Sequence, residues 1–204
     1  MGTELQHAKQ HERFDHLLAV IGSERFLNMQ GLGNEVPFFI CPFPPAQAIE
    51  MAQLQQQLVN SLKQKAIEVL QLNLYDIVCE FMKNEGDWDY YLQIEPERDK
   101  QDLKDDLQSI LDVETVVVPE IAGRMQENEF QVLFLSGVGE VFPYIRSHNV
   151  LNNLQKVAKE HPTVLFFPGQ YDHSLETGAS LNLFGRLQND KYYRAFNIYS
   201  CEVQ

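Results

Sequence analysis

The sequence predicts a single α/β domain with a mainly parallel sheet of about five strands and helices on both faces. Short apolar runs of the kind that parallel sheets bury on both faces recur along the chain. Amphipathic helical segments separate these runs, and parallel strands need such helical crossovers. The length of 204 residues fits one domain better than two.

Five segments are predicted as strands, because each is apolar or alternating over the length of a strand. Pro42, Pro44 and Pro45 are expected to end the first strand, since proline cannot donate to a sheet ladder. Pro168 and Gly169 are expected to end the fourth. The predicted strands are residues 36–41, 67–73, 130–135, 163–167 and 193–199.

Apolar residues at helical spacing predict helices between these strands. Ser23 and Ser147 suit N-cap positions, Gly86 is expected to end a helix, and Pro96 to begin one. Between residues 168 and 193 we expect a loop with a short helix. The other predicted helices are 5–21, 23–27, 46–65, 74–83, 88–94, 97–111, 113–125 and 147–159, with a helical insertion at about 86–127 of the single domain 1–204.

Bulk composition predicts a soluble cytoplasmic protein. Hydrophobic residues are 44% and charged residues 22%, close to the globular average. No apolar run approaches the roughly 20 residues that span a bilayer, and the N-terminus lacks the pattern of a signal peptide. Cys41, Cys79 and Cys201 form no CxxC pair, so we expect buried free thiols in a reducing compartment.

The net charge of −13 argues against direct nucleic-acid binding, which needs several basic residues on one face. The charge is uneven: between Glu80 and Glu114 the chain has twelve acidic and four basic residues. One interpretation is a docking face for a basic partner. The favoured one is a solvated helical surface.

The turn after the first predicted strand argues against nucleotide hydrolysis. A P-loop has the pattern GxxxxGK[ST], in which backbone amides and a lysine hold phosphates. This chain has CPFPPAQAIE there, without Gly or Lys, and its prolines remove amide donors. The strand spacing still resembles a P-loop ATPase sheet, one whose phosphate loop is missing.

The SGVGE segment after the 130–135 strand is the first candidate site. One interpretation of Gly137, Gly139 and Glu140 is an anion-binding turn at a helix N-terminus. The favoured alternative is that the two glycines only permit a tight strand-to-helix turn.

A polar cluster in PYIRSHNVLNNLQ is the second candidate site. In one interpretation it binds a ligand or partner, with Arg146 as an anion clamp. In the other, Ser147 caps a helix and the amides are satisfied at the surface. Both interpretations stay open, and the cluster consists of Arg146, His148, Asn149, Asn152 and Asn153.

Histidine spacing supports neither a zinc site nor a hydrolase triad. His16 follows His11 by five positions, so HExxH is not met. The segment 171–174 (YDHS) has the residue types of a triad, but neighbours in a loop rarely face one another and GxSxG is absent. We expect this segment to be a turn, and we assign no catalytic residue, metal ligand or cofactor.

A basic and aromatic segment near the C-terminus is the third candidate site. Arg186, Lys191 and Arg194 alternate there with Tyr192 and Tyr193. Such alternation can stack nucleic-acid bases. Against the strongly negative net charge, a protein contact is the favoured interpretation, because Tyr and Arg commonly anchor interfaces.

Four segments together resemble the BrxB family of bacteriophage exclusion (BREX) systems: GLGNEVPFFICP, LFLSGVGEVFPYIRSHNVLNNLQ, VLFFPGQY and LFGRLQNDKYYRAFNI. The resemblance runs from about Glu12 to the C-terminus. SGVGEVFPYIRSHNVLNNL is its most specific part. The resemblance assigns no catalytic residues to this chain.

The resemblance implies a non-catalytic adaptor subunit of an antiphage complex. BREX systems combine an ATPase, a DNA methyltransferase and PglZ, a protein of the alkaline-phosphatase superfamily. A PglZ-like protein is the expected partner, with the ATPase and methyltransferase as further ones. One alternative is a domain that senses a nucleotide or anion without hydrolysis, through the SGVGE turn and Arg146. A nuclease or phosphatase is the weakest alternative, because the many acidic residues show no spacing typical of a two-metal site.

Overall fold

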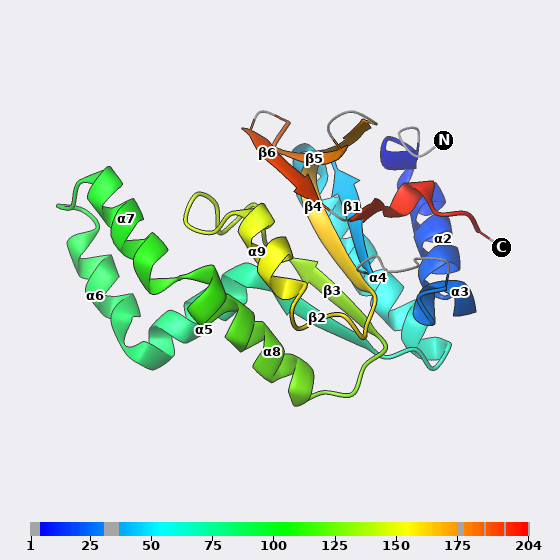
Figure 1. The fold of residues 1–204 in the computed structure, drawn as a ribbon, viewed down its shortest axis with the longest axis horizontal. Helices are drawn as coiled ribbons and strands as arrows, with labels where there is room; N and C mark the ends of the chain where they lie inside the picture. Colours follow the sequence, from blue (N-terminus) through cyan, green and yellow to red (C-terminus); the bar gives the residue numbers. More distant parts are fainter. Residues whose placement is uncertain (1–4, 31–36, 175–177, 186, 194, 204) are drawn as a thin grey trace.

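A computed structural model describes residues 5–30, 37–174, 178–185, 187–193 and 195–203. Across these residues seven strands form one sheet, with helices on both of its faces (Figure 1). The strands are β1 (Phe38–Phe43), β2 (Val69–Asn73), β3 (Val132–Ser136), β4 (Thr163–Ser174), β5 (Gly178–Leu183), β6 (Leu187–Tyr193) and β7 (Phe196–Asn197).

The parallel part of the sheet has the strand order β2-β3-β4-β1-β7. Thr163 on β4 lies opposite Phe38 on one side and opposite Leu133 on the other. All four pairings along this order are parallel. The prediction of a mainly parallel α/β sheet is therefore confirmed. The likeness to a P-loop ATPase sheet stays a prediction.

Eight α-helices and three short helical turns lie in the described ranges. None of these helices combines the length and apolar character that crossing a bilayer requires. They are α2 (Gln10–Ile21), α3 (Glu24–Leu27), α4 (Ala48–Gln64), α5 (Leu74–Glu85), α6 (Asp87–Ile94), α7 (Lys100–Ile110), α8 (Val118–Gln126) and α9 (Ser147–Leu154), with η1 (Pro45–Gln47), η2 (Val113–Val117) and η3 (Ile198–Ser200).

Strand alternation divides the core between the two faces of the sheet. On β1, Phe39 and Cys41 pack with α2, α3 and α4, while Phe38 and Ile40 pack with α5, α8 and α9. All four side chains are buried. Helices α6 and α7 extend from the second layer, away from the sheet (Figure 1). Successive side chains of a strand point to opposite faces, so one short apolar run supplies both cores.

Two of the predicted helix-end signals are confirmed, and two are wrong. The Ser23 hydroxyl accepts a hydrogen bond from the Phe26 amide and caps α3. Gly86 ends α5 in the left-handed region, with φ of +83°. At α9 the N-cap position belongs to Arg146 rather than to Ser147. Pro96 does not begin α7, because Asp99 caps that helix through the amides of Gln101 and Asp102.

The first predicted helix and strand differ from the structure at their ends. The predicted helix 5–21 is interrupted: residues 5 and 6 are helical, residues 7–9 are not, and α2 begins at Gln10. Strand β1 continues through Pro42 to Phe43, so Pro42 does not stop it. Pro42 lies opposite Phe167 at the end of the parallel ladder.

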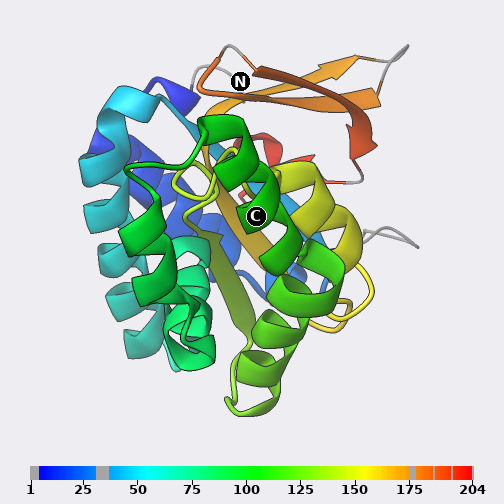
Figure 2. The same cartoon turned by 90° about the vertical axis from the view of Figure 1, so that its left-hand side faces the viewer.

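The prediction for residues 168–193 is wrong. Strand β4 continues past Pro168 and Gly169 to Ser174, so segment 171–174 is strand rather than turn. The loop with a short helix is instead a hairpin of β5 and β6, which lies at the top of both views (Figures 1 and 2). A Cβ at Gly169 would collide with the Asn182 carbonyl, so glycine permits the close approach of β5. Pro168 contributes its carbonyl, which accepts from the Phe184 amide.

Candidate partner-binding site

The carboxyl edge of the parallel sheet brings the SGVGE turn against the end of β2. Gly137 has φ of +82°, and a Cβ there would collide with Asn73 Oδ1. A Cβ at Gly139 would lie 2.9 Å from Pro168 Cγ and 3.1 Å from Phe184 Cε1. Close packing therefore explains why glycine occupies both positions.

Two amides at the end of this turn form hydrogen bonds within it. Glu140 N and Val141 N both donate to the Gly137 carbonyl, at 3.1 and 3.2 Å. A pocket of about 260 Å³ lies beside the turn and includes Asn73 and Ser136 in its lining. Glu140 also lines this pocket, and its exposed carboxylate disfavours an anion there.

The polar cluster around α9 lies mostly at the surface. Arg146 is exposed at the N-cap of α9, and no hydrogen bond or ion pair between described residues joins it to the SGVGE turn. His148 is half-buried. Asn153 donates to the Asn149 carbonyl at 3.0 Å, one turn earlier on the helix, and Asn152 is exposed.

The basic and aromatic segment is described only as backbone. Arg186 and Arg194 lie outside the described residues. Tyr192 and Tyr193 end β6, which pairs with β5 alone among the described strands. The side chains of residues 186–194 are likewise outside the description.

The structure adds a groove that sequence reasoning missed. We call it the α5–α7 groove, because it lies between α5, α6, α7 and the loop 137–146, and its volume is about 380 Å³. The SGVGE turn contributes Glu140 to it. Its buried lining is Val78, Cys79, Met82, Leu103, Leu107, Leu111 and Val141, and its more exposed lining is Tyr75, Trp88, Tyr91, Leu92, Glu95, Glu140 and Tyr144.

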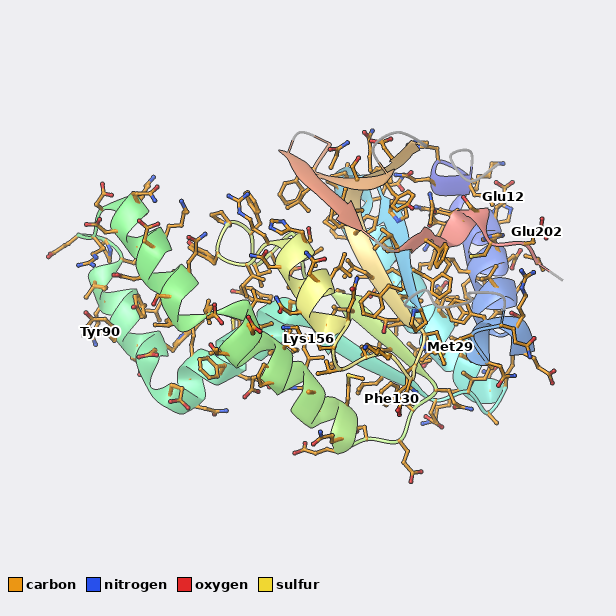
Figure 3. The ribbon with its side chains drawn as sticks, viewed as in Figure 1. Glu12, Met29, Tyr90, Phe130, Lys156 and Glu202 are labelled. Carbon is orange, nitrogen blue, oxygen red and sulfur yellow. The ribbon has the colours of Figure 1, made fainter. Side chains whose placement is uncertain are left out.

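The groove is open because α6 has little to pack against. No residue of α6 is buried. Leu92 is 52% exposed in the groove wall, and Tyr75 of α5 is 44% exposed. Tyr90, which does not line the groove, lies on α6 at the far end of the molecule from Glu12 and Glu202 (Figure 3).

Two carboxylates make the groove acidic. Glu95 ends α6, Glu140 comes from the turn after β3, and neither makes an ion pair with a described basic residue. Burial, followed by the charges of Asp106 and Asp87, raises the pKa of Tyr91.

Two nearby basic residues are already engaged. Arg98 pairs with Asp106 at 2.6 Å, and the Lys83 ammonium lies 5.0 Å from the Trp88 ring centroid. The groove therefore combines an apolar lining with an acidic rim. Among the described residues, no group of three or more His, Cys, Asp or Glu side chains could hold a metal ion.

One signal in the sequence could have indicated the groove. The segment DWDYYLQI places Trp88, Tyr91 and Leu92 within the most acidic part of the chain. Large apolar side chains are unusual on a purely solvated helix. Their common face becomes evident only when α6 is placed beside α5.

Comparisons with known proteins give the family. A model of the family described as BREX protein BrxB matches residues 70–198. A BREX protein BrxB of Bacillus cereus (strain H3081.97) is 34% identical, covering 92% of this chain and 96% of its own length. One from Escherichia coli O9:H4 (strain HS) is 26% identical, covering 91% of this chain and 90% of its own. No solved structure matches. The chain therefore belongs to the BrxB family of proteins of the antiphage BREX systems.

Proposed function

We propose that this protein is a non-catalytic adaptor subunit of its BREX system, and that the α5–α7 groove binds a larger component. The observation that carries the proposal is the exposed apolar lining of the groove, with Leu92 52% and Tyr75 44% exposed. Contiguous exposed apolar surface of this kind marks interaction sites on monomeric proteins.

The residue types of the groove support a protein partner. Trp88, Tyr91, Tyr144 and Met82 line it together, and aromatic residues and Met are enriched at protein interfaces. The choice of a PglZ-like protein as partner rests on the family resemblance. The ATPase and the DNA methyltransferase are further candidates on the same basis.

Co-purification tests this function. The tagged chain is expressed with the whole system, and retained proteins are identified by mass spectrometry. Wild type should retain the PglZ-like protein. The double variant Trp88→Ala/Leu92→Ala should lose it, because both side chains line the groove. Tyr90→Ala is the matched control, since Tyr90 is 55% exposed on the same helix but does not line the groove.

The same assay separates the groove from two other surfaces. Asp102, Asp105 and Asp106 replaced by Asn test the acidic face of α7, and Tyr192 and Tyr193 replaced by Ala test β6. Loss of the partner only with one of these sets would move the contact away from the groove. Retention of no BREX component by wild type would contradict the adaptor role itself.

A further inference from the structure

We propose that the occupant of the α5–α7 groove is an amphipathic α-helix of the partner protein, with large apolar anchors on one face and Lys or Arg beside them. This inference rests on the proposed function and names the chemistry of the partner segment. It follows from the shape of the groove, its lining and its charge.

The shape favours a helix. Three helices and one loop surround an apolar lining, in which Met82, Leu103 and Leu107 are buried. Helix-in-groove recognition places anchors at i, i+3 or i+4 and i+7 on such a lining. An amphipathic helix satisfies its own backbone hydrogen bonds, so it needs no free strand edge or amide from the groove.

The charge favours a basic helix. Glu95 and Glu140 come from different elements and both line the groove without a described basic partner. The surrounding segment 80–114 has an excess of eight acidic residues over basic ones. Arg98 and Lys104 in this segment lie against Asp106 and Asp105, at 2.6 and 3.9 Å. A helix rich in Asp or Glu would be repelled by the carboxylates of the groove. The groove therefore discriminates against acidic partners.

The single tryptophan of the chain provides a reporter in the groove. The sequence contains one Trp, Trp88, and it lines the groove beneath the Lys83 ammonium. Its fluorescence can therefore follow occupation directly if the probe contains no Trp. The 204-residue protein is titrated without any label.

The test uses three synthetic peptides of about 18 residues, each free of Trp. The first is an amphipathic helix with Leu anchors and Lys beside them. The second has Glu in place of each Lys. The third has the composition of the first in scrambled order, so that charge is kept and the apolar face is lost. Only the first should shift the Trp88 emission at micromolar concentration.

Variants locate the binding within the groove. Leu92→Asp should weaken binding of the first peptide about tenfold or more, because a charged side chain replaces an apolar one in the groove wall. Glu95→Gln/Glu140→Gln should weaken it and reduce its dependence on salt. Tyr90→Ala should bind like wild type. Equal binding of the scrambled or acidic peptide, or no effect of these variants, would overturn the inference.

The outcome is separable from that of the proposed function. If wild type retains a BREX component but Leu92→Asp and Glu95→Gln/Glu140→Gln retain it equally, the adaptor role stands and the helix inference fails. If wild type retains none, the adaptor role fails whatever the peptides do. A dimer in light scattering that Leu92→Asp converts to a monomer would make the occupant a second copy, and would also overturn the inference.

Discussion

Gly137 packs directly against the side chain of Asn73, where a Cβ would collide with Asn73 Oδ1 and lie 2.9 Å from the Leu74 amide nitrogen. The same Asn73 oxygen accepts a hydrogen bond from the Tyr75 amide at 2.8 Å and caps α5. The turn after β3 therefore fixes the first turn of the helix that carries Tyr75 into the α5–α7 groove.

Replacing Gly137 by Ala should destabilise the protein more than replacing Gly86. Both glycines have nearly the same φ, +82° and +83°, so both variants incur the left-handed penalty of about 1–2 kcal/mol. A Cβ at Gly86 meets nothing within 4 Å. At Gly137 it must displace Asn73, which should bring the total to ~3 kcal/mol or more. Urea unfolding of the two variants measures the difference, and equal losses would contradict the packing described for Asn73.

Apolar runs were sufficient to predict β1, β3 and the start of β4, whose residues are buried because helices cover both faces of the sheet. Strands β2 and β7 are less buried, and within the predicted strand 193–199, β7 spans only Phe196–Asn197. The β5–β6 hairpin could not be predicted in this way. Its strands, GASLNL and LQNDKYY, mix polar and apolar residues. In the sequence, Gly169 indicates the end of a strand, because only the structure shows that glycine is needed there to let the Asn182 carbonyl come close.

The candidate site was predictable only in part. The SGVGE turn and its tight geometry follow from local sequence. The α5–α7 groove depends on the placement of α6 beside α5 and on the turn after β3, which adds Glu140 to a lining that includes Glu95. Residues from positions 75 to 144 meet there, so no short motif contains the groove.

The purified protein should show no ATP or GTP turnover above background. Pro44 and Pro45 follow β1 and cannot donate amide hydrogen bonds to a phosphate. The Glu140 and Val141 amides donate to Gly137 instead. A phosphate-release assay checks this. Turnover that vanished in Arg146→Ala or Glu140→Gln would show that the carboxyl edge is catalytic and would contradict the adaptor proposal.

The isolated protein should not retard duplex DNA at physiological salt. Duplex binding depends on neutralising phosphates with several basic side chains, and the net charge here is −13. A gel-shift titration at several salt concentrations measures this. Tight binding that weakened steeply with salt would require a basic face and would contradict the prediction.

Stability should fall as the pH rises from about 9 to about 12, because of the Cys41 thiol. Burial raises the pKa of Cys41 to about 12 from its ordinary value of 9.0, although the Tyr199 hydrogen bond and the Arg13 charge oppose the shift. In the unfolded chain the thiol loses its proton near its ordinary pKa, whereas in the folded chain it keeps it. The stabilisation is thus fully present below pH 9 and is lost toward pH 12, at ~1.4 kcal/mol per pH unit.

Tyr199 acts in the same direction, because burial, followed by the nearby Cys41 charge, raises the pKa of its hydroxyl as well. The two side chains lie 3.4 Å apart, sulfur to oxygen. Cys41→Ala separates their effects: the variant loses the thiol and keeps Tyr199. Urea unfolding at pH 8, 9, 9.5 and 10 should then show that the unfolding free energy falls less steeply with pH in the variant than in wild type. Above pH 9 the two slopes should differ by the amount expected for about one proton. Parallel curves would mean that Cys41 ionises equally in the folded and unfolded chain, and that its burial does not hold the proton.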